Sequence, residues 1–316
     1  MTASSAWPAL PLAEWQATLD TLHMWTQIVG KTRLALAPMQ NHWWQVALYL
    51  TPRGLTTSAM PCGDRPSGER SCSVDFDFLS HQLMIQTGDD RHAAVPLVPQ
   101  SVAQFYGAYE AALASVGVRA AIHPVPVEVE TAIPFTLDRQ HATYDPASAQ
   151  AWWQIMLQAD RVMKAFRGRF LGKSSPSHFF WGSFDLAVTR FSGRPAPRFS
   201  GAVPNCPAYV MEEAYSHECS SAGLWPGGGA LDGPAFYSYA YPEPPGFADY
   251  PVRPAGARYD TTLREFVLPY DAVRCAAAPD EVLLEFFQST YEGAATLGRW
   301  DRASLERPDG ATSATP

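Results

Sequence analysis

The chain has 316 residues, 47% of them hydrophobic and only 17% charged, and its formal net charge is −8. An acidic chain without clustered Lys and Arg is poorly suited to bind nucleic acid, because affinity for phosphates depends on such clusters. No apolar run approaches the ~20 residues of a membrane span, and the first residues lack the pattern of a secretory signal. We therefore expect a cytoplasmic protein that folds around its own core and binds neither nucleic acid nor a membrane.

The first half predicts a helix, a group of antiparallel strands and a second helix. Apolar residues recur at helical spacing over 12–29 and stop at Gly30. A loop rich in Gly, Pro and Ser at 57–71 separates the expected strands. The closing helix begins at Ser101 and ends at Gly117. The expected strands are 33–37, 43–51, 73–78 and 83–87.

The second half is expected to follow the same order. Asp145 is a predicted N-cap ahead of Pro146, and helical spacing then continues to Gly168. Strands follow, and the closing helix is expected between Pro279 and Gly298.

Four segments match between the halves in the same order, and we interpret the chain as an α+β protein built from two diverged repeats. The clearest match aligns 41–50 with 177–186 without a gap. The predicted parts are a first repeat at 1–122, a linker or edge strand at 123–144, a second repeat at 145–302 with a long irregular insertion at 195–259, and a disordered tail at 303–316. All of them are expected to form one compact module.

The five cysteines are widely spaced, with no CxxC pair, which predicts free thiols. Cys219 has His217 nearby in the sequence. A nucleophilic thiol needs a positioned base, however, and adjacency in the sequence seldom supplies one.

The insertion concentrates groups that move protons or bind metals. It is rich in aromatic residues, so we expect it to fold back over the protein. Glu213 and His217 are four residues apart, which places both on one face of either a helix or a strand. His217 is the predicted general base or metal ligand, oriented by Glu213 or Glu218 and assisted by Tyr215. The alternative is a His and Glu pair that only holds the loop in place.

A strand predicted after His178 would place Trp181, Ser183 and Asp185 on one face. That face would be aromatic and would also carry polar side chains. Such a face is typical of a ligand pocket. A carboxylate in mid-strand either meets a cation, such as Arg190 or Arg194, or has a perturbed pKa in a site.

His42 and His178 occupy matching positions in the two halves, which allows either a shared metal or acid-base role or simple hydrogen bonding to backbone carbonyls. A divalent metal would need three or four ligands around one point, and no HExxH motif is present. The best available ligand set is His178, His217 and Glu213.

The three glycines at 227–229 allow close approach to a ligand, although a plain turn explains them as well.

The candidate site therefore has two groups of residues. The predicted catalytic residues are His217, Glu213, Glu218, Tyr215, His178 and Asp185. The predicted substrate-binding residues are Trp43, Trp181, Trp225, Gly228 and Tyr239.

The runs at 178–187, 215–218 and 225–229 resemble those of an uncharacterised bacterial domain-of-unknown-function family of similar length. The resemblance covers nearly the whole chain. It implies a soluble bacterial protein and brings no activity, cofactor or assigned residue.

Three functions remain open on the sequence alone. The leading hypothesis is an enzyme that acts on a small organic molecule by His/Glu acid-base or metal-assisted chemistry in an aromatic pocket. A non-catalytic protein that binds a small molecule in the same pocket is the second. The third is a structural protein whose tyrosine-rich insertion forms a homodimer interface.

Overall fold

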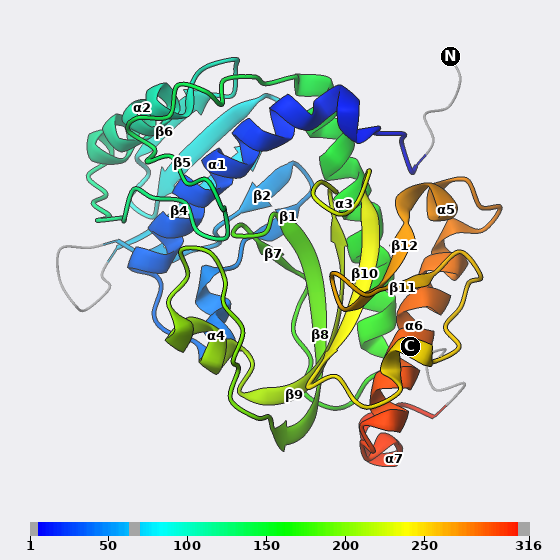
Figure 1. Cartoon of the computed structure of the whole chain (residues 1–316). Coiled ribbons are helices and arrows are strands. Elements are labelled where there is room, and N and C mark those ends of the chain that lie inside the picture. Colours follow the sequence, from blue (N-terminus) through cyan, green and yellow to red (C-terminus); the bar gives the residue numbers. More distant parts are fainter. Residues whose placement is uncertain (1–5, 63–69, 309–316) are drawn as a thin grey trace, which may run out of the picture.

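The computed structural model describes residues 6–62 and 70–308. Each half of the chain contributes one antiparallel sheet flanked by helices (Figure 1). The predicted α+β class is therefore confirmed. In the first half the elements are α1 (Leu12–Leu36), η1 (Asn41–Val46), β1 (Tyr49–Thr51), β2 (Gly54–Thr56), β3 (Met60–Pro61), β4 (Ser71–Asp77), β5 (Gln82–Thr87), β6 (His92–Pro96) and α2 (Val102–Ser115).

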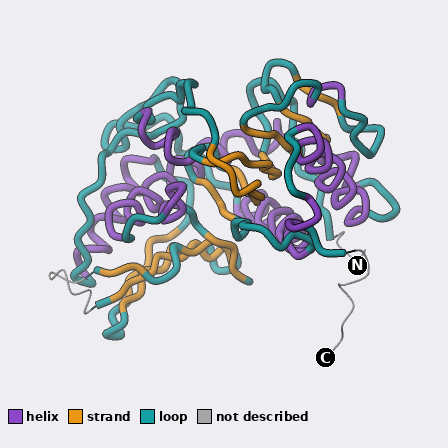
Figure 2. Tube along the Cα trace, turned by 90° about the horizontal axis from the view of Figure 1, so that it is seen from below, coloured by secondary structure: helices purple, strands orange, loops and turns teal. Residues whose placement is uncertain are grey.

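The first sheet has the strand order β1-β2-β4-β5-β6, and β3 pairs with β4. Alternate residues such as Val74, Phe76, Leu83 and Ile85 are fully buried. This alternation is that of a sheet with one face on the core and the other toward water. Figure 2 shows the helices of this half gathered on one side of the sheet.

The second half is longer and supplies a sheet with the order β11-β12-β10-β9-β8-β7. Its elements are α3 (Pro146–Gly168), β7 (His178–Phe180), β8 (Asp185–Pro195), α4 (Ala208–Ala214), β9 (His217–Trp225), β10 (Ala235–Tyr241), η2 (Phe247–Asp249), β11 (Arg258–Asp260), β12 (Glu265–Pro269), α5 (Tyr270–Arg274), α6 (Pro279–Leu297) and α7 (Arg302–Leu305).

One face of the second sheet packs on α3 and α6. Leu186, Val188, Leu224 and Phe236 point to this side and are fully buried. Because successive residues of a strand point to opposite faces, the residues between them point away from the two helices. That second face carries the candidate site.

The two halves share backbone contacts and a core. Leu48 and Phe179 exchange two backbone hydrogen bonds of 2.9 Å each. The rings of Trp15 on α1 and Trp152 on α3 lie 5.4 Å apart, and one hydrophobic cluster contains residues from both halves. The order helix, sheet, helix is present in each half, whereas their origin by duplication stays a prediction.

The predicted helix ends that depend on local signals are correct. The side chains of Ser101 and Gln104 form a capping box at the start of α2, and Gly117 follows that helix with a φ of 71°. Asp145 caps α3 through the N–H of Ser148. The helix predicted from Pro279 is α6, which ends at Leu297.

Gly30 does not end the first helix, and the strand predicted at 33–37 is wrong. α1 continues to Leu36. A Cβ atom on Gly30 would collide with the indole ring of Trp181, so glycine is required there because an aromatic ring packs against the helix backbone.

The gapless match between 41–50 and 177–186 does not extend to the backbone. In the first half, the strand predicted at 43–51 is wrong over its first part, which forms η1, and the strand itself covers only 49–51. In the second half a turn at 181–184 separates β7 from β8. The continuous strand that would have placed Trp181 and Ser183 on one face is therefore also wrong.

Of the linker and the edge strand predicted as alternatives for 123–144, the strand is not formed, and the side chain of Gln27 bonds both the N–H and the carbonyl of Val127. Two further predictions need correction. The segment 195–259 is not irregular, because it contains β9 and β10, which lie inside the second sheet. Residues 303–308 are ordered by α7 and by the bond from the Arg307 N–H to Arg169, while the rest of the predicted tail lies outside the described residues.

Candidate functional site

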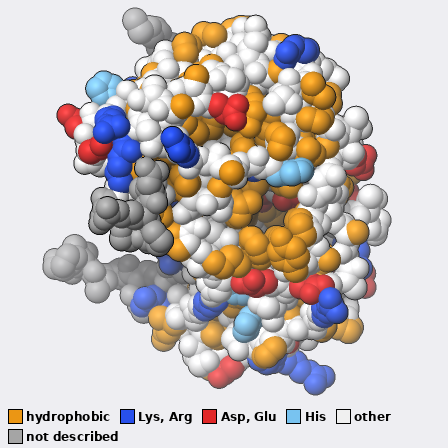
Figure 3. Space-filling model, turned by 90° about the vertical axis from the view of Figure 1, so that its left-hand side faces the viewer, with side chains coloured by type: hydrophobic (Ala, Val, Ile, Leu, Met, Phe, Trp, Pro, Cys, Tyr) orange, Lys and Arg blue, Asp and Glu red, His pale blue; other side chains and the backbone are white. Residues whose placement is uncertain are grey.

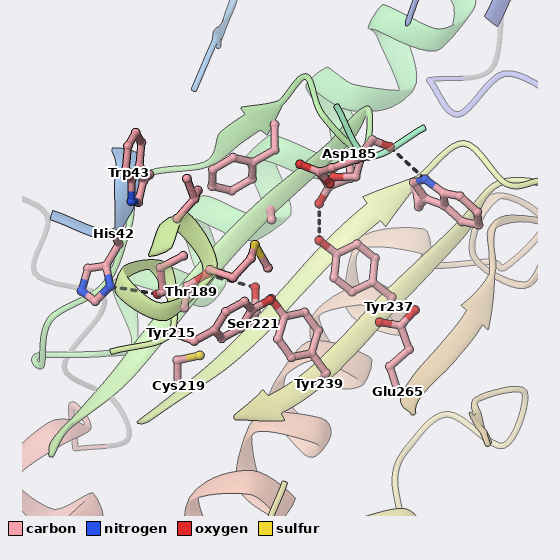
Figure 4. A pocket seen from close by; sticks show the side chains of 18 of the residues that line it. His42, Trp43, Asp185, Thr189, Tyr215, Cys219, Ser221, Tyr237, Tyr239 and Glu265 are labelled. Atoms are coloured by element: carbon pink, nitrogen blue, oxygen red, sulfur yellow. Dashed lines mark hydrogen bonds between the residues drawn. The ribbon is translucent and has the colours of Figure 1, made fainter. Parts of the chain in front are cut away.

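A cavity of about 390 Å³ lies on the second face of the second sheet. Its floor follows strand alternation, since Asp185, Ala187, Thr189 and Phe191 all face it from β8. Neighbouring strands add further side chains, and Figure 4 shows them converging on the same space. These are Cys219, Ser221 and Trp225 from β9, Tyr237 and Tyr239 from β10, and Glu265 from β12.

The walls come from two helical segments far apart in the sequence. η1 contributes His42, Trp43, Trp44 and Val46, and α4 contributes Val210, Met211 and Ala214. α4 and η1 lie on the left-hand side of Figure 1, and the face seen from that side carries a hollow bordered by hydrophobic side chains (Figure 3). The cavity is therefore enclosed only when both halves of the chain are folded.

Two residues of η1 hold an uncommon backbone conformation. His42 and Trp43 have φ angles of 59° and 60°, in the left-handed region. Such conformations persist where surrounding contacts fix them, and they gather at functional sites. Here they direct both side chains into the wall of the cavity.

Asp185 is the most deeply placed carboxyl group of the cavity, at 6% exposure. Ser183 Oγ and Tyr237 OH each donate a hydrogen bond to it. Burial raises the pKa of Asp185, and the two donors oppose that rise because they favour the ionised form. Neither predicted cation meets it, since Arg190 lies over the ring of Phe166 and Arg194 pairs with Glu218.

Tyr237 reaches Asp185 by crossing the neighbouring strand at a glycine. Tyr237 is paired with Gly223 in the ladder between β10 and β9. A Cβ atom on Gly223 would collide with the tyrosine ring. The absence of a side chain on Gly223 therefore lets the phenol lie across β9 and bond to the first residue of β8.

The remaining polar groups of the floor form a hydrogen-bonded chain. The hydroxyls of Tyr215 and Tyr239 are 2.8 Å apart, and those of Thr189 and Ser221 are 3.0 Å apart. Burial raises the pKa of both tyrosines well above the usual value, so they are neutral phenols. Burial also raises the pKa of Cys219 to about 12, which leaves it a thiol and a poor nucleophile at neutral pH.

Two glutamates line the cavity without a hydrogen bond or ion pair to any described residue. Glu265 is half-buried on β12, and burial followed by the charge of Asp185 raises its pKa to about 8. Glu128 is exposed and lies against Gly182, where a Cβ atom would collide with its carboxylate. Because its pKa is about 8, Glu265 is largely protonated at neutral pH.

His42 is fixed in one tautomer by its two neighbours. Its Nδ1 is 3.0 Å from the carbonyl oxygen of Ala214, and its Nε2 is 2.8 Å from Nζ of Lys173. A carbonyl only accepts and an ammonium only donates, so Nδ1 carries the proton and Nε2 accepts. Burial is the main cause that lowers the pKa of His42, and it stays neutral.

The structure brings five of the predicted site residues into the cavity lining and leaves six outside it. Those that line the cavity are Asp185, Tyr215, Trp43, Trp225 and Tyr239. Those outside the lining are His217, Glu213, Glu218, His178, Trp181 and Gly228.

The spacing argument for Glu213 and His217 does not apply, because two elements meet between them. α4 ends at Ala214 and β9 begins at His217. His217 lies beyond the cavity, with its ring 5.6 Å from that of His42. Glu218 points to the opposite face of β9 and binds Arg194 at 2.6 Å.

The predicted metal ligands do not meet. His178 contacts Trp44, whose ring contacts His42, whose ring contacts His217, so two side chains stand between the two predicted ligands. Within residues 6–62 and 70–308, no group of three or more His, Cys, Asp or Glu side chains is arranged to hold a metal ion. The proposed set of His178, His217 and Glu213 is therefore wrong.

His178 is instead a buried neutral histidine, at 1% exposure among aromatic rings. Burial is the main cause that lowers its pKa to about 3. The folded state therefore keeps it neutral while the unfolded chain gains a proton below pH 6.5, and the stability that this neutral state supplies above pH 6.5 is lost as the pH falls toward 3.

Between pH 7 and pH 5, the free energy of unfolding of His178→Phe should fall less than that of the wild type. We expect the two losses to differ by about 2 kcal/mol. Urea unfolding at both pH values measures this difference. His92→Phe, on the exposed strand β6, is the control and should keep the wild-type dependence on pH. Equal losses for His178→Phe and the wild type would contradict the assignment.

Trp181 and Gly228 have structural roles. Trp181 Nε1 donates to the carbonyl of Val46 at 2.8 Å, which ties the turn after β7 to η1. Gly228 and Leu231 exchange two backbone hydrogen bonds across a tight turn, the plainer of the two interpretations given to this glycine run.

Sequence reasoning missed Tyr237, Glu265 and Glu128 as members of the site. The alternation of Tyr237, Tyr239 and Tyr241 is a strand signal that places all three on one face, and it could have identified the first of them. The position of Glu128 depends on a loop that no local pattern predicts.

Two further predictions concern the whole chain. All five cysteines are free, as predicted. No helix in the described part of the chain is both long enough and apolar enough to cross a membrane.

Comparison with known proteins gives a family without an assigned activity. Residues 7–307 match a family described as Family of unknown function (DUF5996). No curated protein and no solved structure matches the chain. The matched range contains both sheets and every residue of the cavity. The chain therefore belongs to this family of unknown function.

Proposed function

We propose that this protein is an enzyme that transfers protons on a small organic molecule held in the cavity over the second sheet. The observation that carries the proposal is the buried carboxylate of Asp185, held by Ser183 and Tyr237 at the end of an aromatic pocket. A buried, perturbed carboxyl group in a cavity is characteristic of catalytic sites.

Two carboxyl groups of the cavity differ in a way that suits acid-base catalysis. Burial raises the pKa of Asp185, and the two hydrogen bonds that it accepts oppose this rise because they favour the ionised form. Glu265 has no such donor among the described residues, and burial raises its pKa to about 8. Of the two, Asp185 alone has donors that favour its ionised form, so we assign Asp185 as the base, and we assign to Glu265 the exchange of a proton with the solvent.

The cavity's size and walls define the kind of substrate. A volume of about 390 Å³ accommodates a small organic molecule rather than a polymer segment. Rings of Trp43, Trp44, Phe191 and Trp225 would cover it and exclude water, which strengthens the polar interactions that remain.

The experiment is to incubate the purified protein with a defined mixture of metabolites. Native mass spectrometry would detect what binds, and NMR spectroscopy of the mixture would detect what is consumed. We expect at least one compound to bind and to be converted. Absence of both binding and conversion would contradict the proposal.

A non-catalytic binding protein is the second candidate, supported by the inert state of two reactive residue types. Cys219 is a buried thiol, and His42 has both ring nitrogens occupied by protein groups. Binding of a compound that is never converted would favour this candidate. Tyrosines of the insertion line or neighbour the cavity, and the dimer interface expected from them stays a prediction.

A further inference from the structure

The cavity lining contains several acidic side chains and no basic side chain except one neutral histidine. Three carboxyl side chains, Glu128, Asp185 and Glu265, face it, and the lining contains neither lysine nor arginine. The only histidine, His42, is neutral and accepts from Lys173 on its Nε2. An anionic ligand would therefore meet carboxylates without a compensating cation.

Two of these carboxyl groups lack the partners that carboxylates elsewhere in the chain have. Asp77 binds Arg53 at 2.7 Å, and Glu218 binds Arg194 at 2.6 Å. By contrast, no described residue forms a hydrogen bond or an ion pair with the carboxyl group of Glu265 or Glu128. Glu265 is half-buried, and a carboxylate removed from water is costly unless a positive charge is close, which the protein does not supply here.

Two lysines lie near the cavity but outside its lining. Lys173 contacts His42, with its Nζ 5.2 Å from the centre of the Trp44 ring. Lys31 is buried on α1, with its Nζ 5.8 Å from the centre of the Trp181 ring. Neither side chain belongs to the lining.

Aromatic rings cover much of the remaining surface. Tyr237 and Tyr239 stack with ring centres 6.1 Å apart on the floor, and Trp43, Trp44 and Trp225 add indole rings. The faces of such rings attract organic cations, so walls of this kind combined with carboxylates favour ammonium groups.

The cavity also has two distinct ends. In Figure 4, Asp185, Tyr237 and Glu265 gather at one end, while Trp43 and His42 lie at the other. A ligand with a charged head and an apolar body fits this polarity, with the head at the carboxyl end.

We infer that the ligand is a small organic amine whose ammonium group binds between Asp185 and Glu265 and whose apolar body lies against the indole rings of η1. This inference rests on the proposed function, because it names the substrate class of the same cavity. Binding of the cation would ionise Glu265 and release its proton to the solvent.

Three probes of similar shape and different charge test the inference. They are 2-phenylethylamine, 2-phenylethanol and phenylacetate, titrated into the full-length protein at pH 7 in a calorimeter. We expect the amine to bind at least tenfold more tightly than the alcohol and the carboxylate. The enthalpy should depend on the buffer, because a proton is released.

Two variants separate charge from shape. Glu265→Gln should weaken amine binding at least tenfold and leave the alcohol unchanged. Glu285→Gln, which removes a carboxylate that pairs with Arg253 on the surface of α6, is the matched control and should bind like the wild type. Circular dichroism verifies that both variants are folded.

The possible outcomes are distinct. Binding of the alcohol or of phenylacetate as tightly as the amine would overturn the inference and leave the proposed function standing. Failure of the amine, together with every primary amine of a wider panel, would overturn it as well. The proposed function fails if no compound of any charge in the metabolite mixture is converted.

Discussion

Asp185→Asn is expected to lower kcat/KM for the substrate by 10²- to 10⁴-fold, the usual contribution of a positioned general base. The amide keeps the size of the side chain but cannot take up a proton. Buried and bonded to Tyr237 and Ser183, it should hold its place, so the loss of activity should come from the missing proton acceptor and not from a displaced side chain. Steady-state kinetics on the substrate found in the metabolite screen measure kcat/KM.

Tyr237→Phe supplies the control for this assignment. The variant removes one donor that favours ionised Asp185, so the pKa of Asp185 should rise further. Because the base must be ionised to act, the acidic limb of the pH profile of kcat/KM should move to higher pH. A profile that stays in place, or full activity in Asp185→Asn, would contradict the role of Asp185 as the base.

Glu265→Gln is expected to stabilise the ligand-free protein at pH 7 by roughly 3 kcal/mol. Burial and the Asp185 charge raise the pKa of Glu265 from the ordinary value of 4.5 to about 8. The fold therefore keeps the proton while the unfolded chain loses it, and stability that is complete below pH 4.5 declines as the pH rises toward 8. Glutamine resembles the protonated form and escapes this loss.

Urea unfolding of wild type and Glu265→Gln at pH 4 and pH 7 measures the effect. The difference in the free energy of unfolding should be near zero at pH 4 and large at pH 7. Glu285→Gln, on the exposed surface of α6, should show no such trend. A difference of the same size at both pH values would mean that the gain comes from packing and not from ionisation. Gain of stability by loss of a site residue is the expected sign of a functional position.

The parts of the fold that could be predicted from the sequence are those governed by neighbouring residues. Ser101, Asp145 and Pro279 mark helix starts because capping and φ preference act within one turn. The failures occur where distant residues decide. Gly30 reads locally as a helix end, whereas its true constraint is the ring of Trp181, which lies about 150 residues away in the sequence.

The distinction between neighbouring and distant residues also applies to the candidate site. Asp185 could be identified because a carboxylate beside a run of apolar residues is unusual on its own. The spacing of Glu213 and His217 predicts a shared face only within one element, and a helix and a strand meet between them. Glu265 could not be identified, because its place in the same cavity as Asp185 depends on the order of strands in the sheet.

The hydrogen bonds between Leu48 and Phe179 have a consequence for how the molecule melts. They place η1 of the first half as a wall over the sheet of the second half, so a bound ligand would touch both. Its binding energy would then be lost if either half unfolded. Saturating ligand should therefore raise the melting temperature of both halves together. The two halves should melt in one cooperative transition, and its midpoint temperature should rise with the logarithm of the ligand concentration.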